Sequence, residues 1–222
     1  MNKIIVIEGT DCSGKETQSN LLLKRMNEEN INIEKLSFPN YDSPTGKIVG
    51  GSYLGKPEYG ECVFPEGAIN VDSKVASLYY AADRLYNKNK IEEIIKKSNL
   101  ILDRYVESNM AHQGGKIKDR EERYEMYNFL KTLEYDLLKL PKPDMVVFLY
   151  MPYQYALELK KNRVSLDQHE LSEEHLKSAE NTYLELSKLY NYEKINCVSN
   201  DKIRTIEDIN DELYQRVKKL WK

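Results

Sequence analysis

Short runs of apolar, mostly β-branched residues alternate along the chain with segments in which apolar residues recur at helical spacing. The first run, Lys3-Ile4-Ile5-Val6-Ile7, is continuous enough for a strand buried on both faces, as in a parallel sheet. Four later runs have the same character. We therefore predict strands at 3–7, 31–38, 100–103, 145–150 and 192–198.

The segments between these strands predict helices. From Lys15 to Asn30, apolar residues at Leu21, Leu22, Leu23 and Met26 give a helical pattern. Further helical patterns occupy 48–54, 70–97 as two segments, 120–140, 152–161, 173–190 and 206–220, while turn-forming Gly and Pro residues punctuate 40–68. Strands that alternate with helices in this way predict an α/β fold with a five-stranded parallel sheet, helices on both faces, and one domain over 1–222.

Bulk properties narrow the function. A chain of 222 residues holds one well-buried core and is too short for two full catalytic domains. A net charge of -3 gives no reason to expect binding to a nucleic-acid polymer. Three scattered cysteines, no signal-peptide pattern and no run near the ~18 apolar residues of a membrane span predict a soluble cytoplasmic protein with reduced thiols.

The loop after the first strand predicts a phosphate site. Residues 9–17, Gly-Thr-Asp-Cys-Ser-Gly-Lys-Glu-Thr, nearly match the pattern G-x-x-x-x-G-K-[ST] and stand between a predicted strand and a predicted helix. Gly9 and Gly14 let backbone N–H groups converge on phosphate oxygens, the helix N-terminus adds partial positive charge, and Lys15 adds a full charge. A chance match is the alternative, and the position of the loop argues against it.

Glu16 departs from this pattern because a Ser or Thr at that position normally coordinates magnesium. Thr17, one residue on, can take that role, or Glu16 can act through a water. Magnesium keeps several waters and accepts carboxylates together with phosphates. We expect an altered metal shell beside an intact phosphate cradle.

Several motifs, in order along nearly the whole chain, resemble the thymidylate kinase family of P-loop nucleoside monophosphate kinases. They are Glu8–Gln18 for E-G-x-D-x-S-G-K-x-T-Q, Phe38-Pro39 for F-P, Tyr79–Arg84 for aromatic-x-A-x-R, Leu102–Gly114 for D-R-Y-x-x-S-x-x-A-Y-Q-G and Leu140–Asp144 for P-x-P-D. Each motif alone is modest, but together they are specific. The resemblance implies magnesium-dependent phosphoryl transfer from ATP to dTMP, giving dTDP, by a homodimer.

The resemblance implies a donor site built around the phosphate loop. The residues expected to bind ATP are Gly9, Thr10, Asp11, Cys12, Ser13, Gly14, Lys15, Glu16, Thr17 and Gln18. Lys202, before the last helix, is expected near the adenine from its position alone. The metal is expected at Asp11, Thr17 and Asp103, and the predicted catalytic residues are Lys15, Arg104, Arg163 and Asp103.

Arg104 is the main candidate for binding the acceptor. It follows Asp103 at the carboxyl end of a buried strand, where parallel sheets bind ligands, so its guanidinium can fork onto a second phosphate. A surface ion pair with Asp103 is the alternative. The resemblance implies a wider acceptor site, formed by Asp11, Phe38, Pro39, Tyr41, Tyr80, Arg84, Arg104, Ser108, Asn109, His112, Gln113, Asp167 and Glu170.

That set contains two pairs whose members are four positions apart in the sequence. The two members of each pair therefore lie on the same face of a helix. For Tyr80 and Arg84 the resemblance implies stacking on thymine and donation to a base carbonyl; the alternative is a core tyrosine beside an exposed arginine. Asn109 and Gln113 carry amides that can read the base edge, or that are ordinary amides on a helix surface.

The charged segment at 160–171 falls where the family has its lid. Because the first loop has no arginine between Asp11 and Lys15, a lid cation is expected to serve the transferred phosphate, and we choose Arg163. Asp167 and Glu170 resemble the D-x-x-E pair of the lid. A solvated charged loop is the alternative.

Two further departures leave other functions open. Asn40 stands where many relatives have a nearby arginine for the acceptor phosphate, so Lys47 or Arg104 alone is expected to substitute. His112 replaces the tyrosine that packs beside the sugar 2′ position, which leaves selectivity for deoxyribose open. The alternatives are a kinase for another nucleoside monophosphate and a nucleotide-binding regulator that has lost catalysis.

Overall fold

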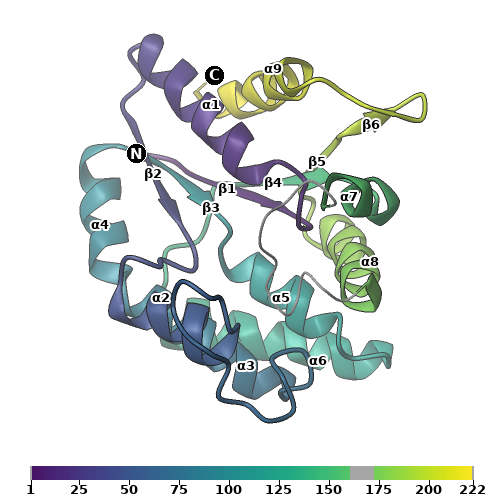
Figure 1. The fold of residues 1–222 in the computed structure, drawn as a ribbon. Helices are drawn as coiled ribbons and strands as arrows, with labels where there is room; N and C mark the ends of the chain where they lie inside the picture. The colour runs from purple at the N-terminus through teal and green to yellow at the C-terminus, as the bar shows by residue number, and fades with distance from the viewer. Residues whose placement is uncertain (1, 161–172, 222) are drawn as a thin grey trace.

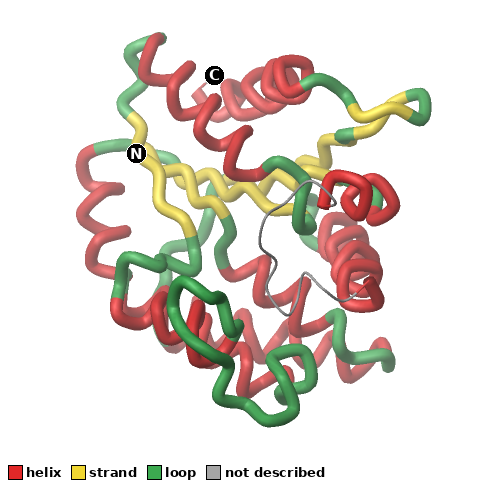
Figure 2. Tube along the Cα trace, in the orientation of Figure 1, coloured by secondary structure: helices red, strands yellow, loops and turns green. Residues whose placement is uncertain are grey.

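The computed structural model describes residues 2–160 and 173–221. Its centre is a parallel sheet with the strand order β2-β3-β1-β4-β5 (Figures 1 and 2). The strands are β1 (Ile4–Gly9), β2 (Ile33–Ser37), β3 (Asn99–Asp103), β4 (Met145–Tyr150) and β5 (Glu193–Asn196). The predicted five-stranded parallel α/β sheet is confirmed.

The two edge strands are shorter than predicted because their neighbours limit them. β2 pairs with β3 from Ile33 opposite Asn99 to Ser37 opposite Asp103, and β3 begins only at Asn99. β5 ends its pairing with β4 at Asn196 opposite Tyr150, the last residue of β4. Apolar composition does not show where a partner strand begins or ends.

Helices cover both faces of the sheet, as predicted. Successive residues of β1 point to opposite faces, so that Ile5 and Ile7 lie in one buried cluster and Ile4 and Val6 in another. The first face is covered by α1 (Lys15–Glu28) and α9 (Ile206–Val217). α7 (Tyr153–Lys160) adds apolar side chains to the same cluster. The second is covered by α4 (Lys88–Lys97), α5 (Val106–Gly114), α6 (Arg120–Lys131) and α8 (Glu173–Leu189).

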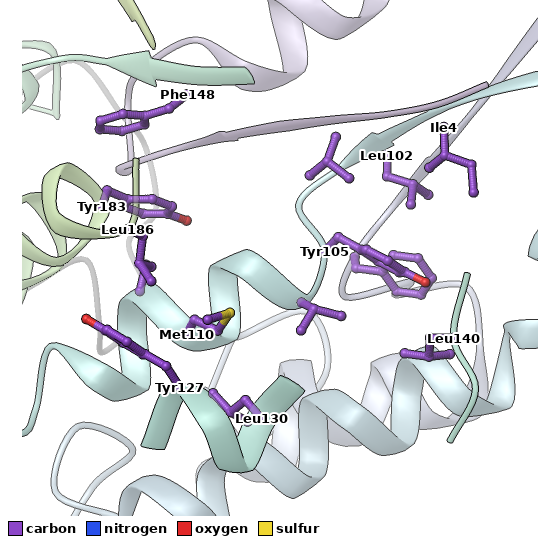
Figure 3. Packing of buried hydrophobic residues seen from close by; sticks show 14 of the residues in the cluster. Ile4, Leu102, Tyr105, Met110, Tyr127, Leu130, Leu140, Phe148, Tyr183 and Leu186 are labelled. Atoms are coloured by element: carbon purple, nitrogen blue, oxygen red, sulfur yellow. The ribbon is translucent and has the colours of Figure 1, made fainter. Parts of the chain in front are cut away.

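On the second face of the sheet, buried side chains of the neighbouring elements pack against one side of α5 (Figure 3). The rings of Phe148 on β4 and Tyr183 on α8 stack with centroids 5.2 Å apart. Met110 of α5 belongs to the same cluster as Tyr127 and Leu130 of α6. Burying each of these large side chains contributes about 1.5–3 kcal/mol. The packing therefore fixes the helix whose other face looks toward the site described below.

The segment between β2 and β3 has a small core of its own. α2 (Pro44–Ile48) runs directly into a π-helical turn, η1 (Val49–Tyr53), and both pack on α3 (Ser73–Tyr86) around the buried ring of Tyr53. The helix predicted at 48–54 therefore starts earlier, at Pro44, where Ser43 caps it. A Cβ on Gly46 would lie 1.8 Å from the carbonyl oxygen of Asn40, so this turn requires glycine.

Other details were not predicted. The helix expected at 120–140 consists of α6 and a π-helical segment, η2 (Thr132–Leu137). A hairpin of β6 (Val198–Ser199) and β7 (Lys202–Ile203) follows β5, and a 3₁₀ turn, η3 (Lys218–Trp221), follows α9. Strands two residues long carry no periodicity that a sequence pattern can reveal.

The strand order decides where a ligand can enter. β1 lies between β3 and β4. After β1 the chain turns into α1 on the first face, and after β3 it turns into α5 on the second face (Figure 1). Ligands of open α/β sheets bind in the crevice between two such exits, at the carboxyl ends of the strands.

Candidate active site

A cavity of about 430 Å³ opens beyond the carboxyl ends of β1, β2 and β3. We call it the central cavity. It brings together many predicted site residues, namely Asp11, Cys12, Gly14, Lys15, Glu16, Thr17, Phe38, Pro39, Tyr41, Tyr80, Arg84, Asp103, Arg104, Ser108, Asn109, His112 and Gln113. The predicted donor loop and the predicted acceptor residues therefore share one space.

The phosphate loop is tightly curled between β1 and α1. Gly14 has a φ of 82°, in the left-handed region that favours glycine. A Cβ on Gly9 would lie 2.4 Å from Ser13 Oγ and 2.7 Å from the carbonyl oxygen of Leu149, so a side chain there would displace the loop. Lys15 Nζ folds back and donates to the carbonyl oxygen of Thr10, 2.7 Å away. The loop has the shape that a phosphate cradle needs.

Two groups of the loop fit a triphosphate. Burial, helped by the nearby charge of Arg104, lowers the pKa of Lys15 to about 8, although Asp11 and Asp103 oppose the shift. A bound polyanion would favour the charged lysine and offset that burial. The hydroxyl of Ser13 is buried and has no hydrogen-bond partner among the residues that the structure describes. A buried hydroxyl that lacks a partner is suited to form a hydrogen bond with a phosphate oxygen of a bound triphosphate.

Arg104 is held by a constrained backbone and a carboxylate. Its φ is 67°, which a non-glycine residue adopts at a cost, and its N–H donates to the carbonyl oxygen of Ile7, 3.1 Å away. The guanidinium forms an ion pair with Asp11 of the phosphate loop. Burial opposes the charge on Arg104, but Asp11 and Glu8 outweigh it and raise its pKa. The arginine therefore pairs with Asp11 and not with Asp103, the partner that we had considered.

A histidine pair extends from Arg104. His112 Nε2 lies 3.2 Å from Arg104 Nη1, and His112 Nδ1 lies 3.2 Å from Nε2 of His175, a buried residue of α8. Because a guanidinium only donates, a neutral His112 accepts at Nε2 and donates from Nδ1 to His175. His175 was not predicted, since only the packing of α8 on α5 brings it to His112.

Glu8 is a further residue of the site that was not predicted. This fully buried carboxylate ends the apolar run of β1 and accepts from the N–H groups of Tyr105 and Ser108, at 2.8 and 3.1 Å. It also accepts from the hydroxyls of Ser108 and Tyr183, at 2.6 and 2.7 Å. Burial raises its pKa. Glu8 thus fixes the start of α5 directly after Arg104. Its signal in the sequence was an acid at the end of an otherwise apolar strand.

Arg84 is buried, which excludes the alternative of an exposed arginine. Its guanidinium forms a two-pronged ion pair with Glu134 of η2 and donates from Nη1 to the carbonyl oxygen of Tyr105, 3.2 Å away. Glu134 also accepts from Asn109 Nδ2 at 3.0 Å. These bonds leave one N–H on each terminal nitrogen of Arg84 for a ligand. Glu134 was missed because it reads as a polar position in an amphipathic helix.

Two amides of α5 have unsatisfied atoms in the wall of the central cavity. Gln113 is fully buried, and neither its Oε1 nor its Nε2 has a hydrogen-bond partner among the described residues. The same holds for Oδ1 of Asn109. Tyr80 lines the cavity nearby, edge-on to Tyr53 at 5.6 Å between centroids. Unpaired amide atoms beside an aromatic wall suit a heterocycle with donors and acceptors on its edge.

The candidate metal ligands are distributed along one side of this cavity. Asp103 is engaged, because Lys35 Nζ lies 3.5 Å and Ser19 Oγ lies 3.4 Å from its Oδ2. Glu16 and Thr17 are exposed and line the cavity. Within the described ranges, no group of three or more His, Cys, Asp or Glu residues could hold a metal by itself. This donor set fits a magnesium ion held mainly by phosphates and waters.

Lys56 is a cavity residue that the sequence did not reveal. Its Nζ lies 5.2 Å from the ring centroid of Tyr41, which stacks on Tyr59 at 5.0 Å. It lies in the Gly- and Pro-rich segment, where no pattern distinguishes it from Lys47. Lys47 is exposed and is not part of the cavity wall. Lys56, unlike Lys47, therefore lies on the wall of the central cavity.

Some predicted residues lie elsewhere. Gln18 does not line the central cavity, since its Nε2 donates to the carbonyl oxygen of Ile206 and its Oε1 accepts from Asn210, both at 2.9 Å, which fastens α1 to α9. Lys202 is exposed on β7 and outside the cavity wall. Gly9, Thr10 and Ser13 form the loop behind that wall. The remaining predictions, Arg163, Asp167 and Glu170, fall outside the described residues.

Comparisons with known proteins agree with this geometry. None of the helices in 2–160 and 173–221 has the length and apolar character to cross a membrane. A family model described as thymidylate kinase matches residues 7–213. A probable thymidylate kinase of Methanocaldococcus jannaschii is 31% identical over 222 residues, covering 99% of this chain and 97% of that protein. The thymidylate kinase of Plasmodium falciparum is 29% identical over 220 residues, covering 98% and 90%.

A solved structure extends the likeness to the fold. Thymidylate kinase from Candida albicans matches with a TM-score of 0.71 at 22% sequence identity, over 98% of this chain and 92% of that one. The match to the family model spans most of the sequence and includes the phosphate loop, Arg104 and α5. The chain belongs to the thymidylate kinase family.

Proposed function

We propose that this protein transfers the terminal phosphoryl group of ATP to the 5′-phosphate of dTMP, giving ADP and dTDP. One observation carries the proposal: Lys15 of the phosphate loop and Arg104, directly after β3, line the same cavity, and Asp11 of that loop forms an ion pair with Arg104. Phosphoryl transfer between two nucleotides needs two phosphate subsites facing each other and little covalent chemistry. Membership of the thymidylate kinase family selects dTMP as the acceptor.

The donor occupies the phosphate loop. Backbone N–H groups of residues 10–15 and the N-terminus of α1 receive the phosphate oxygens, and Ser13 Oγ gains the partner that it lacks. Lys15 leaves the carbonyl oxygen of Thr10 and places its charge on the terminal phosphates. Lys202 remains the candidate for the adenine end.

The acceptor is held by Arg104 with its phosphate facing the donor. An oxygen of the dTMP phosphate attacks the terminal phosphorus of ATP, and the bond from that phosphorus to the bridging oxygen breaks, leaving the electron pair on ADP. Arg104 aligns the attacking group, and its ion pair with Asp11 fixes the guanidinium before the substrate arrives. No covalent enzyme intermediate is required.

Magnesium fits beside Glu16 and Thr17. When bound, the ion neutralises charge between the donor phosphates. The Thr17 hydroxyl can contact it directly and Glu16 can act through a water, since both line the cavity. Asp103 and Asp11 form ion pairs with Lys35 and Arg104, and would accept hydrogen bonds from waters bound to the ion.

The base is read by α3 and α5. Tyr80 provides the stacking surface, Arg84 donates one of its remaining N–H groups to a base carbonyl, and Gln113 satisfies its amide on the base edge. Glu134 keeps both Arg84 and Asn109 in place. Phe38, Pro39 and Tyr41 close the same subsite.

The remaining assignments rest on the sequence and the family. Residues 1–222 form one kinase domain, the segment 160–171 is its lid, and Arg163 brings a cation to the transferred phosphate. Asp167 and Glu170 of that segment contact the acceptor sugar or the metal. The protein acts in the cytoplasm on nucleotides, without a nucleic-acid polymer as partner.

A homodimer completes the proposal. One side of α3 is apolar and exposed: Val75, Leu78 and Leu85 are 43%, 49% and 43% exposed, at spacings of three and seven that keep them on one face. Burial against a second copy would cover this stripe. A Leu78→Glu variant is expected to sediment as a monomer while the unchanged protein sediments as a dimer. A monomeric unchanged protein would refute the dimer.

A coupled assay of ADP formation tests the reaction. With ATP and magnesium, dTMP is expected to be preferred over dUMP, dCMP, dGMP and ribothymidine monophosphate. Arg104→Ala is expected to lower kcat/KM by about 10²–10³-fold, whereas Arg120→Ala, an exposed arginine of α6, leaves it unchanged. A preference for another monophosphate, or no magnesium-dependent ADP formation with any of them, would refute the proposal.

A further inference from the structure

A second cavity, of about 350 Å³, lies behind α5. We call it the rear cavity; its wall comes from α5, the end of α6, η2, β4 with the segment leading into it, and the turn between α8 and β5. Glu107 and Met110 of α5 line it, whereas Ser108 and His112 of the same helix line the central cavity. One helix thus separates the two spaces, and the proposed kinase reaction makes no use of the rear one.

Glu107 gives the rear cavity an unsatisfied buried acceptor. The residue is 5% exposed, and its Oε1 accepts from the hydroxyl of Tyr135 at 2.6 Å. Its Oε2 is buried and has no hydrogen-bond partner in the parts of the chain that the structure describes. Burial, together with the charge of Glu8, raises the pKa of Glu107 to about 7. A buried carboxylate oxygen without a partner can accept a hydrogen bond from a bound ligand.

The rest of the wall is aromatic and apolar. Tyr135, Tyr190 and Tyr192 line the rear cavity together with Glu107, and the rings of Tyr190 and Tyr192 stack at 6.2 Å between centroids. Met110 and Val146 complete the apolar part. Such a wall suits a flat ring, and the volume lies in the range of small-molecule sites.

The rim of the rear cavity carries two cations. Lys131 Nζ lies 4.7 Å from the ring centroid of Tyr190, and Lys142 Nζ lies 5.7 Å from that of Tyr135. Asp136 is the one rim carboxylate in the described wall and lies 3.6 Å from Lys142. The opening is therefore positive, while the interior presents a carboxylate.

We propose that the rear cavity binds a small planar molecule with an N–H donor on its ring and an anionic substituent. The N–H donates to Glu107 Oε2, the ring packs among the tyrosines, and the anion meets Lys131 and Lys142. Amino-substituted aromatic acids and N–H heterocycles that bear a carboxylate or phosphate share this chemistry.

Three related probes test the proposal by ligand-observed NMR with dTMP in excess. Anthranilate has the ring, the N–H donor and the anion; benzoate lacks the donor and aniline lacks the anion. Anthranilate is expected to bind at least about tenfold more tightly than either, and more tightly at about pH 8 than at about pH 6, where Glu107 is protonated. No binding of anthranilate, or equal binding of benzoate or aniline, would overturn the proposal.

Variants test whether anthranilate binds in the rear cavity. Glu107→Leu removes the acceptor and Val146→Phe fills the cavity, so each is expected to abolish anthranilate binding; a thermal unfolding curve for each shows that it is folded. Lys131→Ala with Lys142→Ala is expected to weaken binding several-fold, whereas Lys97→Ala, at an exposed position of α4, has no effect.

Arg104→Ala separates this site from the kinase reaction. It is expected to leave anthranilate binding unchanged even though it disables the central cavity. Undiminished binding in a folded Glu107→Leu or Val146→Phe protein would refute the rear-cavity site, whatever the outcome of the kinase assay.

Discussion

Replacing Glu134 by Leu tests how the acceptor pocket is built. In the unchanged protein Glu134 is fully buried and accepts two hydrogen bonds from Arg84 and one from Asn109. The substitution leaves the guanidinium of Arg84 buried beside an apolar side chain. Its remaining described acceptor is the carbonyl oxygen of Tyr105, at 3.2 Å.

The expected loss follows from that geometry. The two side chains of the pair are 3% and 0% exposed, so solvent does not screen the interaction. Removing one member of a buried ion pair costs about 3–5 kcal/mol, because the other charge stays buried without its partner. For a domain of this size that corresponds to a fall in Tm of roughly 6–20 °C. Removing both members is much milder when apolar groups of similar volume replace them.

Thermal and urea unfolding of four proteins measure the effect: unchanged, Glu134→Leu, Arg84→Met, and the double variant. We expect the double variant to be more stable than Glu134→Leu, and Glu125→Leu, at an exposed position of α6, to change stability little. KM for dTMP should rise in all three pair variants, since Arg84 is misplaced or absent. A loss below about 1 kcal/mol in Glu134→Leu, or a double variant no more stable than it, would refute the reasoning.

Three further predictions concern the reaction. Because the pKa of Lys15 is lowered to about 8, kcat/KM for ATP should fall as pH rises through about 8, and Lys15→Arg should remove this fall; an unchanged profile would contradict it. Glu16→Thr should lower the magnesium needed for half-maximal rate by about tenfold, and no change would show that residue 16 is remote from the metal. His112→Tyr should raise the preference for dTMP over its ribose counterpart by about tenfold; an unaltered ratio would exclude residue 112 from sugar selection.

Lys15 also affects the free energy of unfolding of the protein without nucleotide. Its folded pKa is below the ordinary lysine value, so between about pH 8 and pH 10 the unfolded chain binds more protons than the folded one. The contribution of Lys15 to stability should therefore rise with pH across that window. Urea unfolding at several pH values, with Lys15→Met as the control, measures it; a contribution that falls with pH would contradict the sign.

Sequence patterns predicted the elements whose signal depends only on residues close together in the chain. β1 and β4 carry continuous apolar runs because both faces are covered, so the predicted strands closely match the observed ones. The phosphate loop was predicted because its conformation depends on glycines close together in the sequence. η1 and η2 were not predicted, since the change from α- to π-helical hydrogen bonding leaves the apolar spacing nearly unchanged.

The site was predicted in its residues and less completely in its contacts. Arg104 was expected to bind a phosphate, but its ion pair with Asp11 depends on how β1 and β3 lie side by side. Glu8 and Glu134 were missed for the same reason, because each acts through a partner distant in sequence. Lys56 has no local pattern and enters the cavity through the packing of the segment around Tyr53.

By itself the sequence determined the α/β class, the number of strands in the parallel sheet, the phosphate loop and the identity of most charged and amide groups that line the central cavity. Only the tertiary structure decided which charges pair, that His112 meets His175, and that a cavity with an unsatisfied carboxylate lies behind α5. The physical reason is that periodicity records the exposure of each residue relative to its own helix or strand. Pairing and cavities depend on which elements meet, and that is fixed by long-range packing of the whole chain.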